Sequence, residues 1–254
     1  MKTLLQVLAL LFPLLSFGQY NQDIQSDRPG KAILGQSPGA RVFQLQMGYS
    51  FQRIKITGVT THALTQATVF RVGVTERVEL NSRVDWRVED TTFPTDGVEY
   101  KAGISRTQFG TRLSLLQNKG WIPALGLQTG LLLRGESRPY WKRGLGSEFI
   151  LITGNKISDR ISFNTNWGFR KEDEQTPAKF SYVFNLTFFL SKNIGSFAEV
   201  YGDFGDANPS FDTGFFCRVN PDFQVDVASG WQGDGMISDW FLNLGLSWRL
   251  DWRN

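Results

Sequence analysis

Charged side chains recur at every second position of the segment 78–88. Glu79, Arg83, Asp85 and Arg87 share one set of alternate positions, and the intervening positions are nearly all apolar. Side chains alternate between the two faces of a β-strand, so these charges lie on one face. Guanidinium and carboxylate groups arranged in this way either line a polar path for a solute or neutralise one another in a closed network of ion pairs. The sequence leaves both roles open.

Nucleophilic and metal chemistry have few residues to draw on. The chain holds one His and one Cys, which excludes a disulfide framework, a cysteine metal cluster and a multi-histidine metal site. His62 is the sole candidate for the imidazole base of a hydrolase, but no Ser stands at a motif spacing from it. Cys217 falls on an apolar strand face, where it acts as a small hydrophobe. We therefore predict no catalytic residues, no metal and no cofactor.

The overall composition excludes further classes. The 254 residues carry 27 Lys+Arg and 24 Asp+Glu, a balance too even for a basic patch, so we expect no nucleic-acid partner. A hydrophobic content of 41% is too high for a disordered chain. The 26 Gly residues and the aromatic content of 14% together favour β structure.

The first eighteen residues have the form of an export signal. Lys2 precedes an apolar run over 4–17, and the small residues Ser16 and Gly18 suit a signal peptidase. We predict a signal peptide over 1–18, cleaved after Gly18. The alternative is a membrane anchor, but the run is shorter than the roughly twenty residues that a spanning helix needs. No Cys follows the predicted cut, so we expect no lipoprotein anchor.

The rest of the chain consists largely of segments in which polar and apolar residues alternate. Alternation of this kind between turn residues predicts β-strands. Twelve such segments occur, at 41–54, 63–74, 77–89, 98–116, 121–133, 146–154, 160–170, 179–190, 196–203, 211–219, 223–231 and 239–250. No helical periodicity is evident after residue 18, so the fold class is all-β.

Short and long connections alternate between these segments. The short turns are at 75–77, 117–120, 155–159, 191–195 and 220–222, and the longer loops are at 55–62, 90–97, 134–145, 171–179, 204–210 and 232–238. Short turns on one side and longer loops on the other are typical of bacterial outer-membrane barrels. An even number of strands places both termini on the short-turn side, the periplasm.

Alternation alone does not tell which face of such a wall points outward. A soluble lipocalin-like barrel would bury the apolar face inside. Here the apolar face is bulky and the opposite face carries charges deep within the strands, which favours an outward apolar face. Trp121 and Trp240 are among several Trp residues near segment ends, as interface girdles require. We predict a transmembrane up-and-down antiparallel β-barrel of about twelve strands over 41–254.

The last segment also fits a barrel-assembly signal. Asn243, Gly245, Trp248 and Leu250 stand at the required polar, glycine, aromatic and hydrophobic positions, although the pattern stops four residues before the end. We therefore expect the barrel-assembly machinery to be a partner.

With the apolar face outward, a set of charged residues from several strands points into the lumen. The predicted lumen-lining residues are Arg71, Glu79, Arg83, Asp85, Arg87, Arg112, Glu199, Asp226 and Arg249. Arg71 and Glu79 flank a short turn, so they are expected to pair across neighbouring strands. The mixture of signs argues against strong selection for anions or cations.

The segment 19–40 shows no alternation and is rich in Gly and Pro. It is either a mobile periplasmic extension or a plug that folds into the lumen. In the second case Asp27 and Arg28 would meet charges of the wall.

A basic and aromatic stretch at 134–143 is predicted to be extracellular. It either contacts the phosphates of lipopolysaccharide or is simply solvated. Outer-membrane lipid and lipopolysaccharide are therefore expected partners, and a small-molecule solute is a further one.

Five short motifs follow one another in order along the chain. They are IQSDRP at 24–29, RVFQLQMGY at 41–49, FRVGVTERVEL at 70–80, NPDFQVDVASG at 220–230 and GLSWR at 245–249. This order resembles the outer-membrane transporter family named after a meta-pathway of phenol degradation, over about residues 24–250. The signal ending SFGQ at 16–19 resembles a Bacteroidota-type signal. The family name implies uptake of aromatic compounds, but no motif here identifies phenol as the ligand.

We therefore expect an outer-membrane channel that passes a small, hydrophobic or aromatic solute by diffusion. The alternative is a sealed barrel that serves as a structural or accessory subunit of an outer-membrane complex. An outer-membrane enzyme that depends on His62 is a third possibility. No energy-coupling box is evident near the predicted mature N-terminus, so active uptake is not expected.

Overall fold

A computed structural model describes residues 23–95, 97–133, 137–141, 144–205, 208–233 and 237–252. The predicted signal peptide lies outside these residues, as does part of the stretch 134–143. The described strands are β1 (Val42–Ile56), β2 (Val59–Gly73), β3 (Val78–Phe93), β4 (Gly97–Leu116), β5 (Ala124–Leu132), β6 (Gly146–Ser158), β7 (Ile161–Lys171), β8 (Lys179–Phe189), β9 (Ile194–Asp203), β10 (Ser210–Asn220), β11 (Phe223–Gly233) and β12 (Ile237–Asp251). A short 3-10 turn, η2 (Arg138–Tyr140), lies between β5 and β6.

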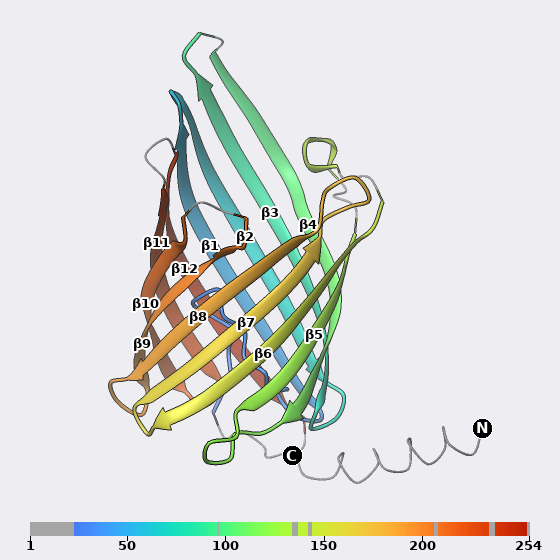
Figure 1. Ribbon diagram of the computed structural model, residues 1–254, viewed down its shortest axis with the longest axis vertical. Helices are drawn as coiled ribbons and strands as arrows, with labels where there is room; N and C mark the ends of the chain where they lie inside the picture. The colour runs from blue at the N-terminus through green and yellow to red at the C-terminus, as the bar shows by residue number, and fades with distance from the viewer. Residues whose placement is uncertain are drawn as a thin grey trace, which may run out of the picture.

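These strands form a closed antiparallel barrel (Figure 1). Each strand pairs with its neighbour in the chain, and β1 pairs with β12 from Val42↔Asp251 to Ile56↔Ile237 to close the sheet. Closure leaves no unpaired strand edge. The predicted twelve-stranded up-and-down topology is confirmed for the described part of the chain. No helix among the described residues is both long and apolar enough to cross a membrane.

Side-chain alternation sorts the wall into a polar inner face and an apolar outer face. In β1, Gln44 and Gln46 are buried, whereas the large side chains Tyr49 and Phe51 are 46% and 44% exposed. The same division holds around the barrel, and exposed apolar side chains on the outer face include Phe70, Leu80, Phe109, Leu151, Phe180, Phe215 and Leu244. The interior is correspondingly rich in buried charges and amides, so the barrel needs ion pairs and hydrogen bonds inside to stabilise it.

Two connections that the sequence predicts as long loops are tight turns instead. β1 and β2 are joined by Thr57 and Gly58, whose φ angles of 43° and 89° suit a two-residue hairpin turn. The predicted loops at 55–62 and 90–97 are therefore wrong, because most of these residues continue the strands. The hairpin of β3 and β4 rises above the rest of the rim (Figure 1). Apolar alternation fades in these extensions because polar pairs such as Thr61 and Thr91, whose hydroxyls are 3.0 Å apart, replace it.

The opposite rim, here called the short-turn end, carries connections as short as Asp159–Arg160 and Pro221–Asp222. Residues 23–41, here called the N-terminal segment, lie inside the barrel toward this end (Figure 1). The other rim is called the hairpin end. The charged residues predicted to line the lumen therefore fall into two groups, one beside the N-terminal segment and one nearer the hairpin end.

Candidate functional site

The N-terminal segment makes hydrogen bonds with the inner wall around most of its circumference. Its wall contacts include Ile24 N to Pro221 O at 2.7 Å, Ile33 N to Asn166 Oδ1 at 2.7 Å, Ser37 N to Ser114 Oγ at 2.8 Å and Ser26 Oγ to Ser247 Oγ at 2.7 Å. These partners come from β4, β7, β12 and the turn before β11. The segment therefore crosses the lumen rather than following one side of it.

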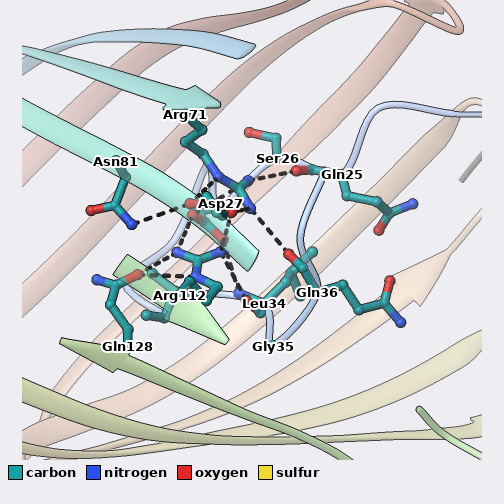
Figure 2. A network of polar contacts seen from close by, with 12 residues as sticks. Gln25, Ser26, Asp27, Leu34, Gly35, Gln36, Arg71, Asn81, Arg112 and Gln128 are labelled. Atoms are coloured by element: carbon teal, nitrogen blue, oxygen red, sulfur yellow. Dashed lines mark hydrogen bonds and ion pairs between the residues drawn. The ribbon is translucent and has the colours of Figure 1, made fainter. Parts of the chain in front are cut away.

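Asp27 is the centre of a charged cluster between this segment and the wall (Figure 2). Its carboxylate accepts two hydrogen bonds from Arg112 on β4, at 3.0 and 2.8 Å, and lies 3.5 Å from Arg71 on β2. The Leu34 N–H donates to the same carboxylate at 2.9 Å and so folds the segment around it. Two guanidinium groups thus hold one carboxylate of the segment.

Arg71 joins the segment to a second carboxylate. Its side chain is fully buried and donates two hydrogen bonds to Glu79 on β3, at 2.9 and 2.7 Å. The pair expected from the sequence therefore forms. Arg71 also donates to the backbone carbonyls of Gln25 at 2.9 Å and Gln36 at 3.1 Å (Figure 2). A planar guanidinium with five donors can serve all these acceptors together, which a Lys could not.

The charge state of Asp27 follows from this environment. Burial raises the pKa of its carboxyl, but the guanidinium groups of Arg112 and Arg71 outweigh burial and hold the net pKa below the ordinary value. Asp27 therefore remains ionised at neutral pH, and the cluster keeps its full attraction.

Arg28 anchors the segment to a second part of the wall. Its side chain donates to Asp226 on β11 at 3.0 Å and 3.3 Å. The guanidinium lies over Gly48 of β1 and Gly245 of β12, which face each other across the seam that closes the barrel. A Cβ atom at either glycine would meet the guanidinium within 2.1 Å. The two glycines therefore leave the space that Arg28 occupies.

The charges nearer the hairpin end are differently placed. Arg83 pairs with Asp85 at 2.8 Å and Arg87 pairs with Glu89 at 2.6 Å, in both cases along the same strand. The Arg83 side chain is 41% exposed although it lies on the inner face. Water therefore reaches this part of the lumen.

The remaining predicted lumen residues lie beside the N-terminal segment or at the short-turn end. Glu199 on β9 accepts the backbone N–H groups of Lys31 at 2.6 Å and Ala32 at 3.0 Å. Arg249 on β12 pairs with Asp222 at the short-turn end, at 2.6 Å. All nine side chains thus have charged or polar contacts within the described part of the barrel.

Several functional candidates were missed by the sequence analysis. Glu148 on β6 accepts from Arg170 at 2.6 Å and Gln108 at 2.8 Å, and lies 3.4 Å from Arg106. Strand parity would have placed Glu148 and Arg170 inside, and Arg106 shares the parity of Arg112 on the C-terminal side of the irregularity at Ser105. Two further inward groups are Lys31 of the N-terminal segment and Asp212 on β10.

A cavity of about 240 Å³ lies at the short-turn end between the N-terminal segment and the wall. Wall residues at its surface include Asn164, Asn185, Thr187, Phe197 and Phe216. Among the residues that the structure describes, no group of three or more His, Cys, Asp or Glu side chains could hold a metal ion. The cavity lining offers polar and aromatic contacts.

The other singled-out residues lie on the outer face or at the seam. His62 is exposed within β2, not in a loop, which corrects its predicted location. Trp248 of the predicted assembly signal packs edge-on against Phe43 across the seam, with ring centroids 6.4 Å apart. Gly245 of the same pattern faces Arg28. Cys217 is a free thiol on β10.

Comparison with known proteins agrees with this architecture. A family model described as “Putative MetA-pathway of phenol degradation” matches residues 26–250, which confirms the resemblance drawn from the motifs. A search of curated sequences finds no match.

Two solved structures share the fold. The COG4313 outer membrane channel from Pseudomonas putida F1 has a TM-score of 0.63 at 9% identity, over 88% of this chain and 99% of that chain. The translocator domain of the autotransporter NalP from Neisseria meningitidis has a TM-score of 0.53 at 10% identity, over 82% and 88%. At such low identity the likeness concerns the fold alone.

Proposed function

This chain belongs to the family described as “Putative MetA-pathway of phenol degradation”, and we propose that it is an outer-membrane channel through which a small solute passes by diffusion. The observation that carries the proposal is the division of the wall. Large apolar side chains are exposed on the outside, while Arg83 and Arg170 inside the closed barrel remain open to water. A closed sheet with this division satisfies its backbone in lipid and keeps a polar path.

The domain boundaries are part of the same proposal. A signal peptide over 1–18 directs export, residues 19–40 form the plug, and 41–254 form the barrel. The proposed plug is supported by the contacts of Asp27 with Arg112 and Arg71 and by the contact of Arg28 with Asp226. The barrel-assembly machinery and lipopolysaccharide remain proposed partners.

The solute class rests on the aromatic side chains of the inner wall. Phe197 and Phe216 line the cavity at the short-turn end, beside the amides of Asn164 and Asn185. Aromatic faces can stack on a planar solute, and the amides can bind its polar groups. A small aromatic solute with one polar group fits this lining, in keeping with the family name.

Solute flux through liposomes tests the proposal. The refolded full chain, its folding verified by a heat-dependent gel shift, is placed in liposomes that are then diluted into isotonic solutions of graded solutes. We expect small solutes to swell the liposomes and larger ones to fail, with protein-free liposomes and heat-unfolded protein as controls. No flux through a folded barrel, with or without residues 20–38, would contradict a channel.

A patch of aromatic rings on the outer face favours a second candidate function. Trp167 packs against Phe184 with centroids 5.4 Å apart, and Tyr182 packs against Phe204 at 5.3 Å. Such a patch suits a structural subunit that binds another membrane protein laterally. A Trp167→Ala and Phe184→Ala double variant would then lose a co-migrating complex on native gels but keep solute flux.

A further inference from the structure

We propose that the inner wall of β9–β12 carries a recognition site for an organic ammonium group, and that the chain's own Lys31 occupies this site as an internal ligand. The inference adds ammonium compounds to the solutes of the proposed channel, so its biological role rests on the proposed function. The binding itself can be measured without any flux.

Two aromatic rings flank the Lys31 ammonium group. The Nζ atom lies 5.6 Å from the ring centroid of Tyr201 on β9 and 5.2 Å from that of Phe241 on β12. Both distances are within the range of cation–π attraction, the interaction by which aromatic cages bind quaternary ammonium ligands. One cation between two rings is therefore in a site that suits other ammonium groups.

Carboxylates complete the site. Asp212 on β10 and Glu199 on β9 are directly paired positions, so two acidic side chains stand next to each other on the inner face. Like charges that face each other across strands destabilise a sheet unless a cation lies near them. Lys31 is attracted most by Asp212 and less by Glu199 and Asp239, while the guanidinium of Arg83 repels it.

Asp212 is the strongest sign that the site serves a ligand. It is only 5% exposed, and neither of its carboxylate oxygens accepts a hydrogen bond from any residue that the structure describes. A buried carboxylate without donors is costly. A cation that enters from the lumen would lie next to this carboxyl group, which already attracts the Lys31 ammonium group.

A glycine leaves room for the ring and the carboxylate of the site. Gly230 on β11 pairs with Asp212 on one side and with Phe241 on the other. A Cβ atom there would lie 2.5 Å from the Phe241 ring and 2.7 Å from the Asp212 Cβ. The glycine therefore leaves the space that the Phe241 ring and the Asp212 side chain occupy.

The wall holds the backbone of Lys31, whereas the Lys31 side chain can move away from the site. Glu199 binds the backbone N–H of Lys31 at 2.6 Å, and a Cβ atom at Gly30 would collide with this carboxylate. The Lys31 residue itself is exposed to the water of the lumen. A solute ammonium can thus replace the lysine head group while the backbone stays in place.

Calorimetric titration of the refolded barrel in detergent tests the inference, with choline as the probe. The reference ligand is the uncharged isostere of choline, in which a tert-butyl group replaces the trimethylammonium group. We expect Lys31→Met to bind choline at least tenfold more tightly than the unaltered chain, because the site is vacated. Lys192→Met removes the same charge from the exposed turn before β9, away from the cavity, and should leave choline affinity unchanged.

Two further variants separate the site from general electrostatics. Adding Asp212→Asn or Phe241→Leu to Lys31→Met should abolish the gain, provided that the gel shift shows a folded barrel. Equal choline affinity in Lys31→Met and the unaltered chain, or equal binding of the uncharged isostere, would overturn the site. Flux without choline binding would reject the site and keep the channel, whereas binding without flux would reject the channel and keep the site.

Discussion

The two halves of the lumen use the same residue types in different ways. Toward the short-turn end, Arg71 and Glu79 are fully buried and bound to each other and to the N-terminal segment. Toward the hairpin end, Arg83 and Arg170 are 41% and 40% exposed, although each has a carboxylate partner. One inward ladder of charges is therefore a closed network at one level and a water-exposed lining at another.

Strand parity therefore determines the face on which a charged side chain lies but not its role. The role of a charge depends on what lies opposite it, and the buried charges toward the short-turn end lie against the N-terminal segment. Buried charges that lose a partner cost several kcal/mol, whereas exposed pairs contribute little. Substitutions of matched residues in the two halves test this difference.

The largest effect is expected from Arg71→Met. The change leaves Glu79 buried without its partner and removes one of the two cations beside Asp27, so the free energy of unfolding should fall by about 3–5 kcal/mol. Urea titration of the barrel in lipid vesicles measures it. Arg170→Met is the matched control and should cost less than about 1 kcal/mol, because Arg170 is 40% exposed and Glu148 keeps Arg106 and Gln108 as partners. Similar losses in both variants would mean that the halves do not differ.

A smaller effect is expected at the glycine pair beneath Arg28. Gly48→Val should push the guanidinium away from Asp226 and loosen the segment, at an overpacking cost of roughly 1–3 kcal/mol. We expect the loosened segment to raise single-channel conductance about twofold to fivefold. In an Arg28→Ala background the same substitution should add little, because the clash is gone. Additive effects of the two changes would show that Gly48 acts independently of Arg28.

The lining of the upper lumen should respond more weakly still. Arg83→Ala and Asp85→Ala should each change conductance by about twofold, since each removes a charge that faces the water path. Val84→Ala, which alters the outer face of the same strand, should leave conductance unchanged. If all three variants behave alike, the inward assignment of Arg83 and Asp85 fails.

The smallest effect is expected from pH near neutrality. The pKa of Asp27 is held below its ordinary value of 3.8, so its contribution to docking is complete above that value and is lost as the pH falls through the lower, folded-state pKa. The part of the conductance that depends on Asp27 should therefore be constant from pH 8 to 5 and change only in stronger acid. Asp27→Asn should abolish this acid step, and an acid step that persists in the variant would assign it to another group.

Much of this architecture is predictable from sequence because the wall repeats a period of two. The twelve strands, the outward apolar face and the Arg71–Glu79 pair all follow from parity and adjacency. The tight turn at Thr57 and Gly58 does not follow from parity, because the strand ends beside it carry polar residues on both faces and so show no polar–apolar alternation. For Asp27 and Arg28 the sequence leaves a mobile extension and a plug both open, and the position of Lys31 escapes prediction, because their segment has no period and takes its shape from the wall.

Single-channel conductance of the refolded chain, with and without residues 20–38, tests the central claim most directly. The claim is that the N-terminal segment restricts a lumen that is otherwise open to water. We predict small, steady steps for the full chain and steps several times larger for the deletion variant, both in barrels that pass the gel-shift test. Equal conductance of the two folded proteins would contradict the restriction, and the lumen's limiting diameter would then have to lie in the wall itself.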